Sequence, residues 1–299
     1  MSDITAPDVS SVPPVHSGFY GRLYGRLAPM RRYVCGQTRS RDFAQPLTIE
    51  DVERMFAEAD RRFAAELGRL GTDAATAVGA TPRQVVSALN YMHPVSKRLT
   101  LCDDVKLDNV LALLYRLHEE RVPGDLIETG VWRGGMTIWM RAALRALGDT
   151  TRAVWVADSF AGLPEPDPAL ELRDAIWSHM LGSVQSLSVG LDDVKRAFAQ
   201  AGLLDARVRF LPGWFADTLP NAPIERLAMM RLDGDWYEST RDALRALYPR
   251  LVPGGYAIID DYGLTTGCAR AVDEYRVQQR IDAPLIVVDR QTVYWRKSR

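Results

Sequence analysis

The amino-acid sequence predicts an α/β fold: a mainly parallel sheet of seven strands with helices on both faces, preceded by a helical N-terminal extension. Two observations carry this prediction. From Pro123 onward, short apolar runs alternate with amphipathic helical segments, the pattern of parallel strands joined by crossover helices. The chain then closes with two short apolar runs, 285–288 and 292–295, three residues apart, which predict a hairpin with one reversed strand.

The first 122 residues show helical patterns and no strand pattern. Residues 1–48 hold a stripe of aromatic and arginine residues from Tyr20 to Tyr33. We interpret it either as an arm that packs on its own domain or on a partner subunit, or as a lid over the substrate. Residues 49–122 predict a helical extension, with a helix from Thr48 to about Leu70, a short one from Pro82, and one over 105–121. Residues 123–299 form the predicted core.

The elements of the core are expected in strict alternation. Strands are predicted at 125–129, 153–158, 208–211, 227–233 and 256–260, and helices at 136–147, 191–201, 238–251 and 268–280. Parallel strands bring their carboxyl ends to one edge of the sheet, where open α/β folds bind their ligands. With its terminal hairpin, this Rossmann-like arrangement favours a methyltransferase core over a dinucleotide-dependent dehydrogenase.

Composition excludes several classes of protein. The formal net charge of −1 indicates neither a nucleic-acid partner nor an anionic membrane surface. No apolar run reaches the ~20 residues that span a bilayer. Cys35, Cys102 and Cys268 are far apart and form no C-x-x-C pair, which predicts a reducing compartment and hence a cytoplasmic protein. The four histidines have no metal-like spacing.

The ends of the first two predicted strands carry a candidate cofactor site. The first strand ends at Glu128 and runs into a turn with Gly130 and Gly134, which lets the backbone approach a ligand closely. The turn lacks the G-x-G-x-x-G pattern of a pyrophosphate cradle, and an acidic residue before it suits an ammonium group such as that of S-adenosylmethionine. The second strand ends in Asp158-Ser159, and an aspartate there can accept hydrogen bonds from ribose hydroxyls.

Aromatic residues follow the third predicted strand, in the sequence Gly213-Trp214-Phe215. These rings suit the two faces of an adenine, and packing into the core is the alternative interpretation. Together with the glycine turn, they indicate an adenosine-containing ligand without choosing which one.

Four carboxylates lie at the ends of the last two parallel strands. Asp233 and Asp235 follow the fourth strand, and Asp260 and Asp261 end the fifth. Like charges gathered at one sheet edge are unfavourable unless they share a proton or a cation. A hard divalent ion such as Mg²⁺ prefers carboxylate and water oxygens. Such an ion can bind a substrate hydroxyl and lower its pKa, while a further carboxylate accepts the proton.

Four motifs together resemble those of the macrocin O-methyltransferase (TylF-type) family. They are Glu128-Thr-Gly-Val-Trp-Arg-Gly-Gly135, Asp158-Ser-Phe160, Leu232-Asp-Gly-Asp-Trp-Tyr-Glu-Ser-Thr240 and Pro253-Gly-Gly-Tyr-Ala-Ile-Ile-Asp-Asp-Tyr262, and the resemblance covers about residues 97 to 296. It implies a class I methyltransferase fold and a cytoplasmic enzyme that uses S-adenosylmethionine and Mg²⁺. The acceptor would be a small-molecule glycoside, methylated on a sugar hydroxyl as in antibiotic biosynthesis.

The resemblance also implies a role for individual residues. Asp233, Asp260 and Asp261 would hold the metal, and Asp235 would be the general base. Glu128 and Asp158 would bind the methionine and ribose parts of the cofactor.

Upstream, the sequence departs from the family pattern. The family carries a His-Thr-Met-Ile-Gly-like stretch where this chain has Leu99-Thr-Leu-Cys-Asp103, so Thr100 alone is kept there as a cofactor contact. Residues 1–96 match the family weakly, which leaves the acceptor open.

Three alternatives to glycoside methylation remain at this point. An oxidoreductase dependent on NAD(P) predicts a dinucleotide glycine pattern that the sequence lacks. A binding or scaffold protein predicts loss of the carboxylates, which are intact. A methyltransferase of small phenols or catechols would share metal and cofactor and differ in its acceptor. The aromatic arm further suggests a homo-oligomer.

Overall fold

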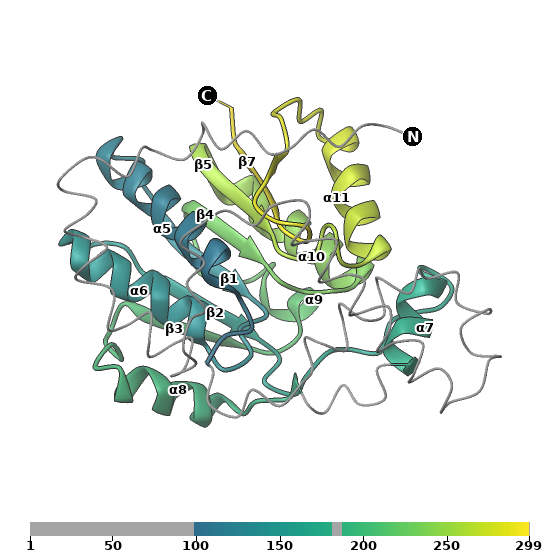
Figure 1. The fold of residues 1–299 in the computed structure, drawn as a ribbon, viewed down its shortest axis with the longest axis horizontal. Coiled ribbons are helices and arrows are strands. Elements are labelled where there is room, and N and C mark those ends of the chain that lie inside the picture. The colour runs from purple at the N-terminus through teal and green to yellow at the C-terminus, as the bar shows by residue number, and fades with distance from the viewer. Residues whose placement is uncertain (1–98, 181–186, 299) are drawn as a thin grey trace, which may run out of the picture.

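A computed structural model describes residues 99–180 and 187–298 of this chain. In this part, seven strands form one sheet in the order β3-β2-β1-β4-β5-β7-β6 (Figure 1). β7 is antiparallel to its neighbours β5 and β6, and the other pairs are parallel. The strands are β1 Asp125–Thr129, β2 Val154–Asp158, β3 Val208–Pro212, β4 Leu227–Leu232, β5 Leu251–Ile259, β6 Ile286–Val287 and β7 Val293–Arg296. The predicted seven-stranded sheet with its terminal hairpin is confirmed.

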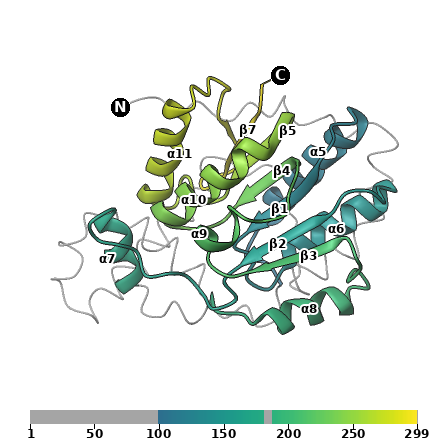
Figure 2. The same cartoon turned by 180° about the vertical axis from the view of Figure 1, so that it is seen from behind.

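Helices cover both faces of the sheet, as the opposite views of Figures 1 and 2 show. Successive strand residues point to opposite faces, so Leu126 enters the core under α5, α6 and α8, and Ile127 enters the core under α10 and α11. Strands buried on both faces are largely apolar, which is why they read as nearly continuous apolar runs in the sequence. The helices are α5 Asp104–Glu119, α6 Gly135–Leu147, α7 Leu172–Met180, α8 Leu191–Gln200, α9 Phe215–Thr218, α10 Tyr237–Leu247 and α11 Thr266–Gln278.

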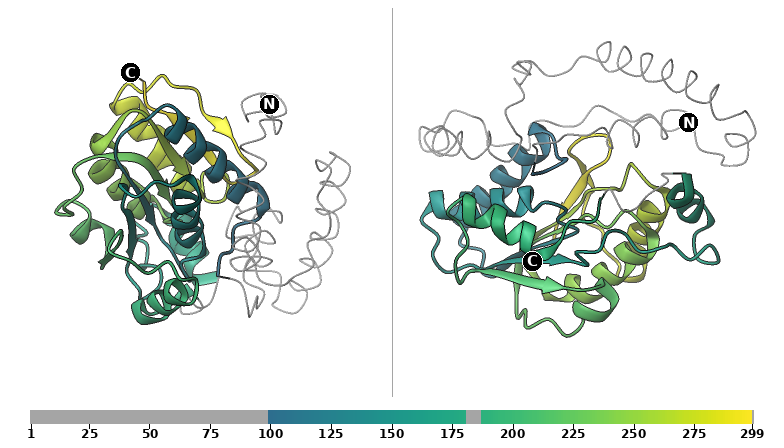
Figure 3. Two further views of the ribbon diagram at one scale, coloured as in Figure 1. Left: turned by 90° about the vertical axis from the view of Figure 1, so that its left-hand side faces the viewer. Right: turned by 90° about the horizontal axis from the view of Figure 1, so that it is seen from below.

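The structure differs from the predicted elements at α10, β5, α7 and α9. α10 ends at Leu247 and passes into a 3₁₀ turn, Tyr248–Arg250, because Pro249 cannot continue an α-helix. β5 begins at Leu251, earlier than predicted, with a register irregularity opposite its first residues. α7 and α9 were not predicted. α7 lies in the connection between β2 and α8, apart from the sheet and beside α11 (Figures 1 and 3).

The predicted arm, residues 1–48, and the predicted helices before residue 99 lie outside the described residues, so the division into three units stays a prediction. The last helix of the extension is present as α5, and the Asp103 side chain caps it by accepting the N–H of Lys106. Within the described ranges, no helix combines the length and the apolar character needed to cross a membrane.

Candidate functional site

A pocket of about 320 Å³ lies at the carboxyl ends of β1, β2 and β4. Further walls come from the connection between β2 and α8, from the stretch before α5 and from the first turns of α10. Three of the predicted site residues, Gly134, Gly213 and Asp260, do not line the pocket. The others all do: Thr100, Glu128, Gly130, Asp158, Ser159, Trp214, Phe215, Asp233, Asp235 and Asp261.

The two glycines of the turn after β1 have different tasks. Gly130 has a φ of 78° in the left-handed region, and a Cβ there would lie 1.7 Å from the carbonyl oxygen of Asp233. It therefore lets the turn after β1 lie directly against the turn after β4. Gly134 stands at the N-terminus of α6, where a Cβ would lie 2.8 Å from the Val194 side chain. Gly134 thus seats α6 against α8 instead of facing the pocket.

Glu128 is a buried carboxylate with only 1% of its surface exposed. It accepts hydrogen bonds from the Thr137 hydroxyl and from the Arg231 guanidinium, the latter at 2.5 Å. Burial raises the pKa of Glu128 to about 7, although Arg231 and Thr137 act in the opposite direction. A carboxylate so placed on the pocket wall can accept an ammonium group of a ligand.

Asp158 connects the turns after β1 and β2. Its two oxygens accept the N–H groups of Val131 and Phe160, each at 2.7 Å. Burial raises the pKa of Asp158, while these N–H groups lower it. The Ser159 hydroxyl donates to the Gly162 carbonyl at 2.7 Å and closes the turn after β2. Asp158 therefore shapes the cofactor side of the pocket and also faces into it.

The residues after β3 include one structural glycine and two pocket aromatics. Gly213 has a φ of 132°, and a Cβ on it would meet the Thr218 side chain at 2.7 Å, so its task is the tight entry into α9. Trp214 is 41% exposed and Phe215 is half-buried, and both line the pocket. Neither ring is fully buried in the core, so both can contact a planar group of a ligand.

Thr100 reaches the pocket because the stretch before α5 crosses the N-terminus of α6. The Gly135 N–H donates to the Leu99 carbonyl at 2.8 Å, and a Cβ on Gly135 would lie 2.5 Å from that carbonyl. Thr100 is buried, and its hydroxyl accepts the N–H of Cys102 at 3.1 Å. Gly135 therefore allows the backbone at Leu99 to lie directly against the N-terminus of α6.

Asp233, Asp235 and Asp261 form a carboxylate group in which one oxygen from each residue lies within 4.8 Å of the others. Asp261 accepts the Asp235 N–H at 3.0 Å, and the Thr265 hydroxyl donates to the Asp235 carbonyl at 2.5 Å. Burial and mutual repulsion raise the pKa to about 6 for Asp233 and to about 8 for Asp235, and place that of Asp261 well above its usual range. Oxygen donors with clustered negative charge fit a hard divalent cation.

Asp260 is not brought into this group. Its carboxylate is buried and contacts Lys106 at 3.0 Å, Arg231 at 2.6 Å and the Thr292 hydroxyl at 3.0 Å. Burial alone would raise the pKa of Asp260, but Arg231 and Lys106 lower it to about 2. Asp260 therefore remains ionised beneath the pocket while the neighbouring Asp261 faces it.

Arg231 is the site residue that sequence reasoning missed. Its guanidinium is 1% exposed and contacts Glu128, Asp233 at 2.8 Å, Asp260 and the sulfur of Cys102 at 3.1 Å. One buried cation thus joins the carboxylate of the cofactor side to two carboxylates of the metal side. The signal was a charged residue inside the apolar strand Leu-Ala-Met-Met-Arg-Leu, since a buried charge requires partners.

Comparison with known proteins agrees with this geometry. Residues 63–297 match the family model for macrocin O-methyltransferases (TylF). A tetracenomycin rhamnosyl 4'-O-methyltransferase from Streptomyces olivaceus is 53% identical over 194 residues, 64% of this chain and 73% of its own. The mycinamicin III 3''-O-methyltransferase from Micromonospora griseorubida is 48% identical over 194 residues, 64% of this chain and 76% of its own. Methyl transfer is thereby favoured over the oxidoreductase and scaffold alternatives.

Solved structures give the same result. The O-methyltransferase NovP is 48% identical and superposes with a TM-score of 0.64 over 68% of this chain and 83% of its own. The calicheamicin methyltransferase CalS11 is 18% identical, with a TM-score of 0.52 over 84% of this chain and 96% of its own, and shares the fold. The matched family model, the relatives and the sheet order together show that this chain belongs to the macrocin O-methyltransferase (TylF) family and is an O-methyltransferase.

Proposed function

We propose that the protein transfers the methyl group of S-adenosylmethionine to a sugar hydroxyl of a glycosylated natural product, with a hard divalent cation held by the pocket carboxylates. One observation carries the proposal: a single pocket joins the Glu128 and Asp158 side to the group of Asp233, Asp235 and Asp261. The names of the relatives, which specify a rhamnosyl and a mycinamicin acceptor, support a sugar over a simple phenol.

The cofactor roles follow from the contacts of the pocket. Glu128 would accept the ammonium group of the methionine part, with Arg231 holding the carboxylate in place from behind. Asp158 would accept the ribose hydroxyls, because its oxygens already lie at the pocket wall. The Trp214 and Phe215 rings would contact the adenine.

For the metal we keep Asp233, Asp260 and Asp261 as the proposed ligands and Asp235 as the general base. Oδ1 of Asp260 accepts both Arg231 and Thr292, whereas Oδ2 accepts only Lys106 and keeps a second lone pair. A bound cation would lower the pKa of an acceptor hydroxyl and orient it. The Asp235 carboxylate has no hydrogen-bond donor among the described residues, whereas its backbone is held by Asp261 and Thr265. A bound cation would lower the raised pKa of Asp235, so that this fixed carboxylate could accept the proton.

Calorimetry with S-adenosylhomocysteine and with NAD tests the cofactor. We expect binding of S-adenosylhomocysteine in about the low-micromolar range of a cofactor held in a preformed cleft. Asp158→Ala should weaken it, because ribose hydroxyls lose a charged acceptor. Binding of NAD alone would refute the assignment.

Magnesium titration of turnover separates ligand from base. Asp260→Asn should weaken the apparent Mg²⁺ affinity and recover activity at high Mg²⁺, because one anionic ligand is lost. Asp235→Asn should keep Mg²⁺ affinity and lower kcat by roughly 10²–10⁴-fold, the usual range for a lost general base. The opposite pattern would make Asp235 the ligand, in keeping with its place beside Asp233 and Asp261. A wild-type rate that is unchanged in EDTA would remove the metal from the proposal.

The cytoplasmic location, the homo-oligomer and the substrate-side role of residues 1–48 remain part of this proposal. Deleting residues 1–45 should raise the acceptor KM or break an oligomer and leave cofactor affinity nearly unchanged. Full activity of the truncated protein would show that the arm is dispensable.

A further inference from the structure

Part of the pocket wall, which we call the roof, is made by the connection between β2 and α8. The roof consists of Leu163, Pro164 and Glu165, and it lies beside the start of α10, because Glu238 accepts the Asp167 N–H. In this connection, α7 packs against α11 rather than against the sheet. The position of the roof therefore depends on how α7 is attached to α10 and α11.

One buried carboxylate makes that attachment. Asp174 of α7 is 1% exposed, and its Oδ2 accepts the main-chain N–H of Tyr237 at 2.7 Å. Tyr237 is the first residue of α10, and the preceding cap residue, Trp236, makes no capping hydrogen bond with its side chain. Asp174 thus supplies the acceptor that the start of α10 lacks in its own sequence.

The same carboxylate lies against the start of α11. A Cβ on Gly267 would lie 1.9 Å from Asp174 Oδ2, and its three nearest contacts would all be Asp174 atoms. Gly267 is the second residue of α11, so the missing side chain leaves room for the carboxylate. Burial raises the pKa of Asp174 to about 6, and the N–H groups of Tyr237 and Gly267 lower it. The Asp174 carboxylate therefore contacts the N-terminal turns of both α10 and α11.

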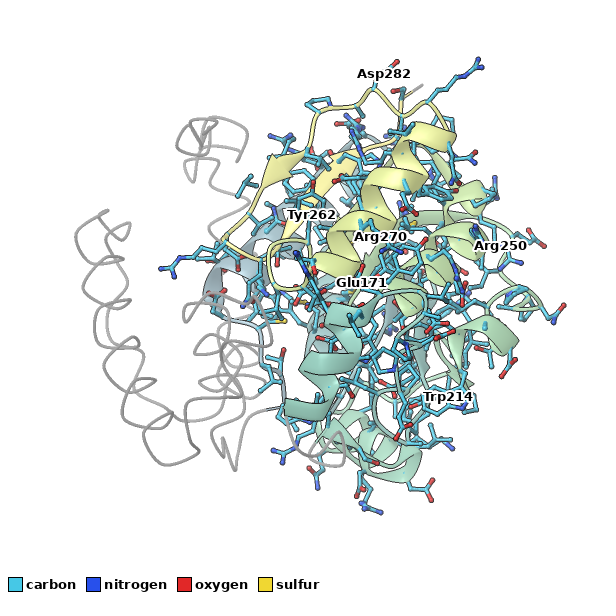
Figure 4. The ribbon with its side chains drawn as sticks, turned by 90° about the vertical axis from the view of Figure 1, so that its right-hand side faces the viewer. Glu171, Trp214, Arg250, Tyr262, Arg270 and Asp282 are labelled. Atoms are coloured by element: carbon cyan, nitrogen blue, oxygen red, sulfur yellow. The ribbon has the colours of Figure 1, made fainter. Side chains whose placement is uncertain are left out.

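The surrounding contacts are polar and more exposed. Arg270 of α11 donates to Glu171 at 2.5 Å and to the Leu170 carbonyl at 2.9 Å, and Figure 4 shows Glu171 and Arg270 side by side. Glu238 of α10 accepts the Asp167 N–H at 3.0 Å. Exposed ion pairs contribute little, whereas buried hydrogen bonds to a charged group contribute more. Among the described polar contacts between this connection and the two helices, the bond of Asp174 is thus the buried one, and we call Asp174 the anchor of the roof.

The residues that Asp174 contacts are close in sequence to the proposed base and to the residue that bonds its backbone. Tyr237 is two residues after Asp235, and Gly267 is two residues after Thr265, whose hydroxyl bonds the Asp235 carbonyl. The roof and the Asp235 carboxylate are consequently attached to the same two helix starts. We propose that Asp174 is a positioning residue for the acceptor, which sets the roof of the pocket over Asp235. This inference rests on the proposed function for the identity of the acceptor.

Steady-state kinetics of Asp174→Ala with a glycoside acceptor test the proposal. We expect the acceptor KM to rise about tenfold or more, equivalent to about 1.4 kcal/mol. The affinity for S-adenosylhomocysteine should stay within about twofold, because the Asp174 carboxylate contacts the starts of α10 and α11 rather than Glu128 or Asp158. Asp174→Asn, which keeps an oxygen for the Tyr237 N–H, should recover part of the loss. Asp282→Ala, an exposed aspartate remote from the pocket (Figure 4), is the matched control.

A second variant disturbs the position of Asp174 by changing its neighbour in α11. Gly267→Ala should raise the acceptor KM like Asp174→Ala, because the new methyl group displaces the carboxylate. In the Asp174→Ala background the same change should add little, since the clash is gone, and this non-additivity identifies the pair. An unchanged KM in Asp174→Ala, or additive effects of the two changes, would overturn the proposal. So would an equal loss of S-adenosylhomocysteine binding.

Hydrogen exchange measured by mass spectrometry gives a readout without turnover. Amides of residues 162–174 should exchange faster in Asp174→Ala than in the wild type, while those of residues 125–135 stay unchanged. Faster exchange in a protein that methylates no glycoside would leave the anchor standing and refute the proposed acceptor. Unchanged exchange would refute the anchor itself.

Discussion

Replacing Arg231 by methionine removes the only cation that contacts both Glu128 and Asp233 among the described residues. Arg231 is 1% exposed, and methionine fills a similar volume without charge. Three carboxylates would then lose a partner, of which Glu128 and Asp260 are buried and Asp233 is 27% exposed. Breaking a buried ion pair by removing one side costs about 3–5 kcal/mol. Proton uptake by Glu128, whose pKa is already raised to about 7, offsets part of this cost and favours the lower end.

Urea unfolding and calorimetry of the free protein at pH 8 measure this loss. For a folded unit of this size each kcal/mol shifts Tm by about 2–4 °C, so we expect Tm to fall by about 6–20 °C. The Tm of Arg231→Lys should lie between those of the wild type and Arg231→Met, because an ammonium keeps the charge but cannot contact the same partners as the planar guanidinium. Arg226→Met on the exposed surface is the matched control. If Arg231→Met is no less stable than this control, the buried cation does not stabilise the fold.

Three further comparisons, made with four variants, test other parts of the structure. Gly130 and Gly148 have similar positive φ angles, 78° and 75°, so alanine at either position costs about 1–2 kcal/mol in backbone strain. Only at Gly130 would the new Cβ also clash with a carbonyl oxygen, that of Asp233. In urea unfolding, Gly130→Ala should therefore be clearly less stable than Gly148→Ala. Burial raises the pKa of Asp149, but hydrogen bonds from Thr151 and Arg152 outweigh it and lower the pKa below its usual value. Asp149→Ala should therefore be less stable than the wild type at pH 7. The difference in free energy of unfolding should shrink as pH falls below about 4, because protonation of Asp149 removes its contribution. Equal differences at pH 7 and pH 3 would contradict this. Trp139→Phe removes the bond from the indole N–H to the Leu107 carbonyl at 2.9 Å and should cost about 1 kcal/mol in the same measurement.

The sheet and its helices could be predicted because local periodicity determines them. Apolar runs such as 125–129 and 227–232 are buried on both faces, and the carboxyl ends of parallel strands meet at one edge. The pocket residues at these ends, including Glu128, Asp158 and Asp233, were found for this reason.

Contacts between distant segments could not be predicted in this way. Asp260 and Asp261 are adjacent in sequence, and spacing alone does not say that one meets Lys106 and Arg231 while the other faces the pocket. α7 was missed because its position depends on Asp174 and Tyr237, which are 63 residues apart. The role of Arg231 likewise exists only once three strands lie side by side.

The anchor of α7 has a consequence for how acceptor preference can diverge. Asp174 bonds to a main-chain N–H, a group that every residue except proline presents, and it requires a particular residue type only at position 267. The side chains of the roof, such as Leu163 and Glu165, can therefore be exchanged without disturbing the attachment. A catalyst built in this way can acquire new acceptors through a short surface segment while its sheet and its carboxylates stay the same. Libraries confined to residues 162–166 are accordingly the most economical route to redirecting it.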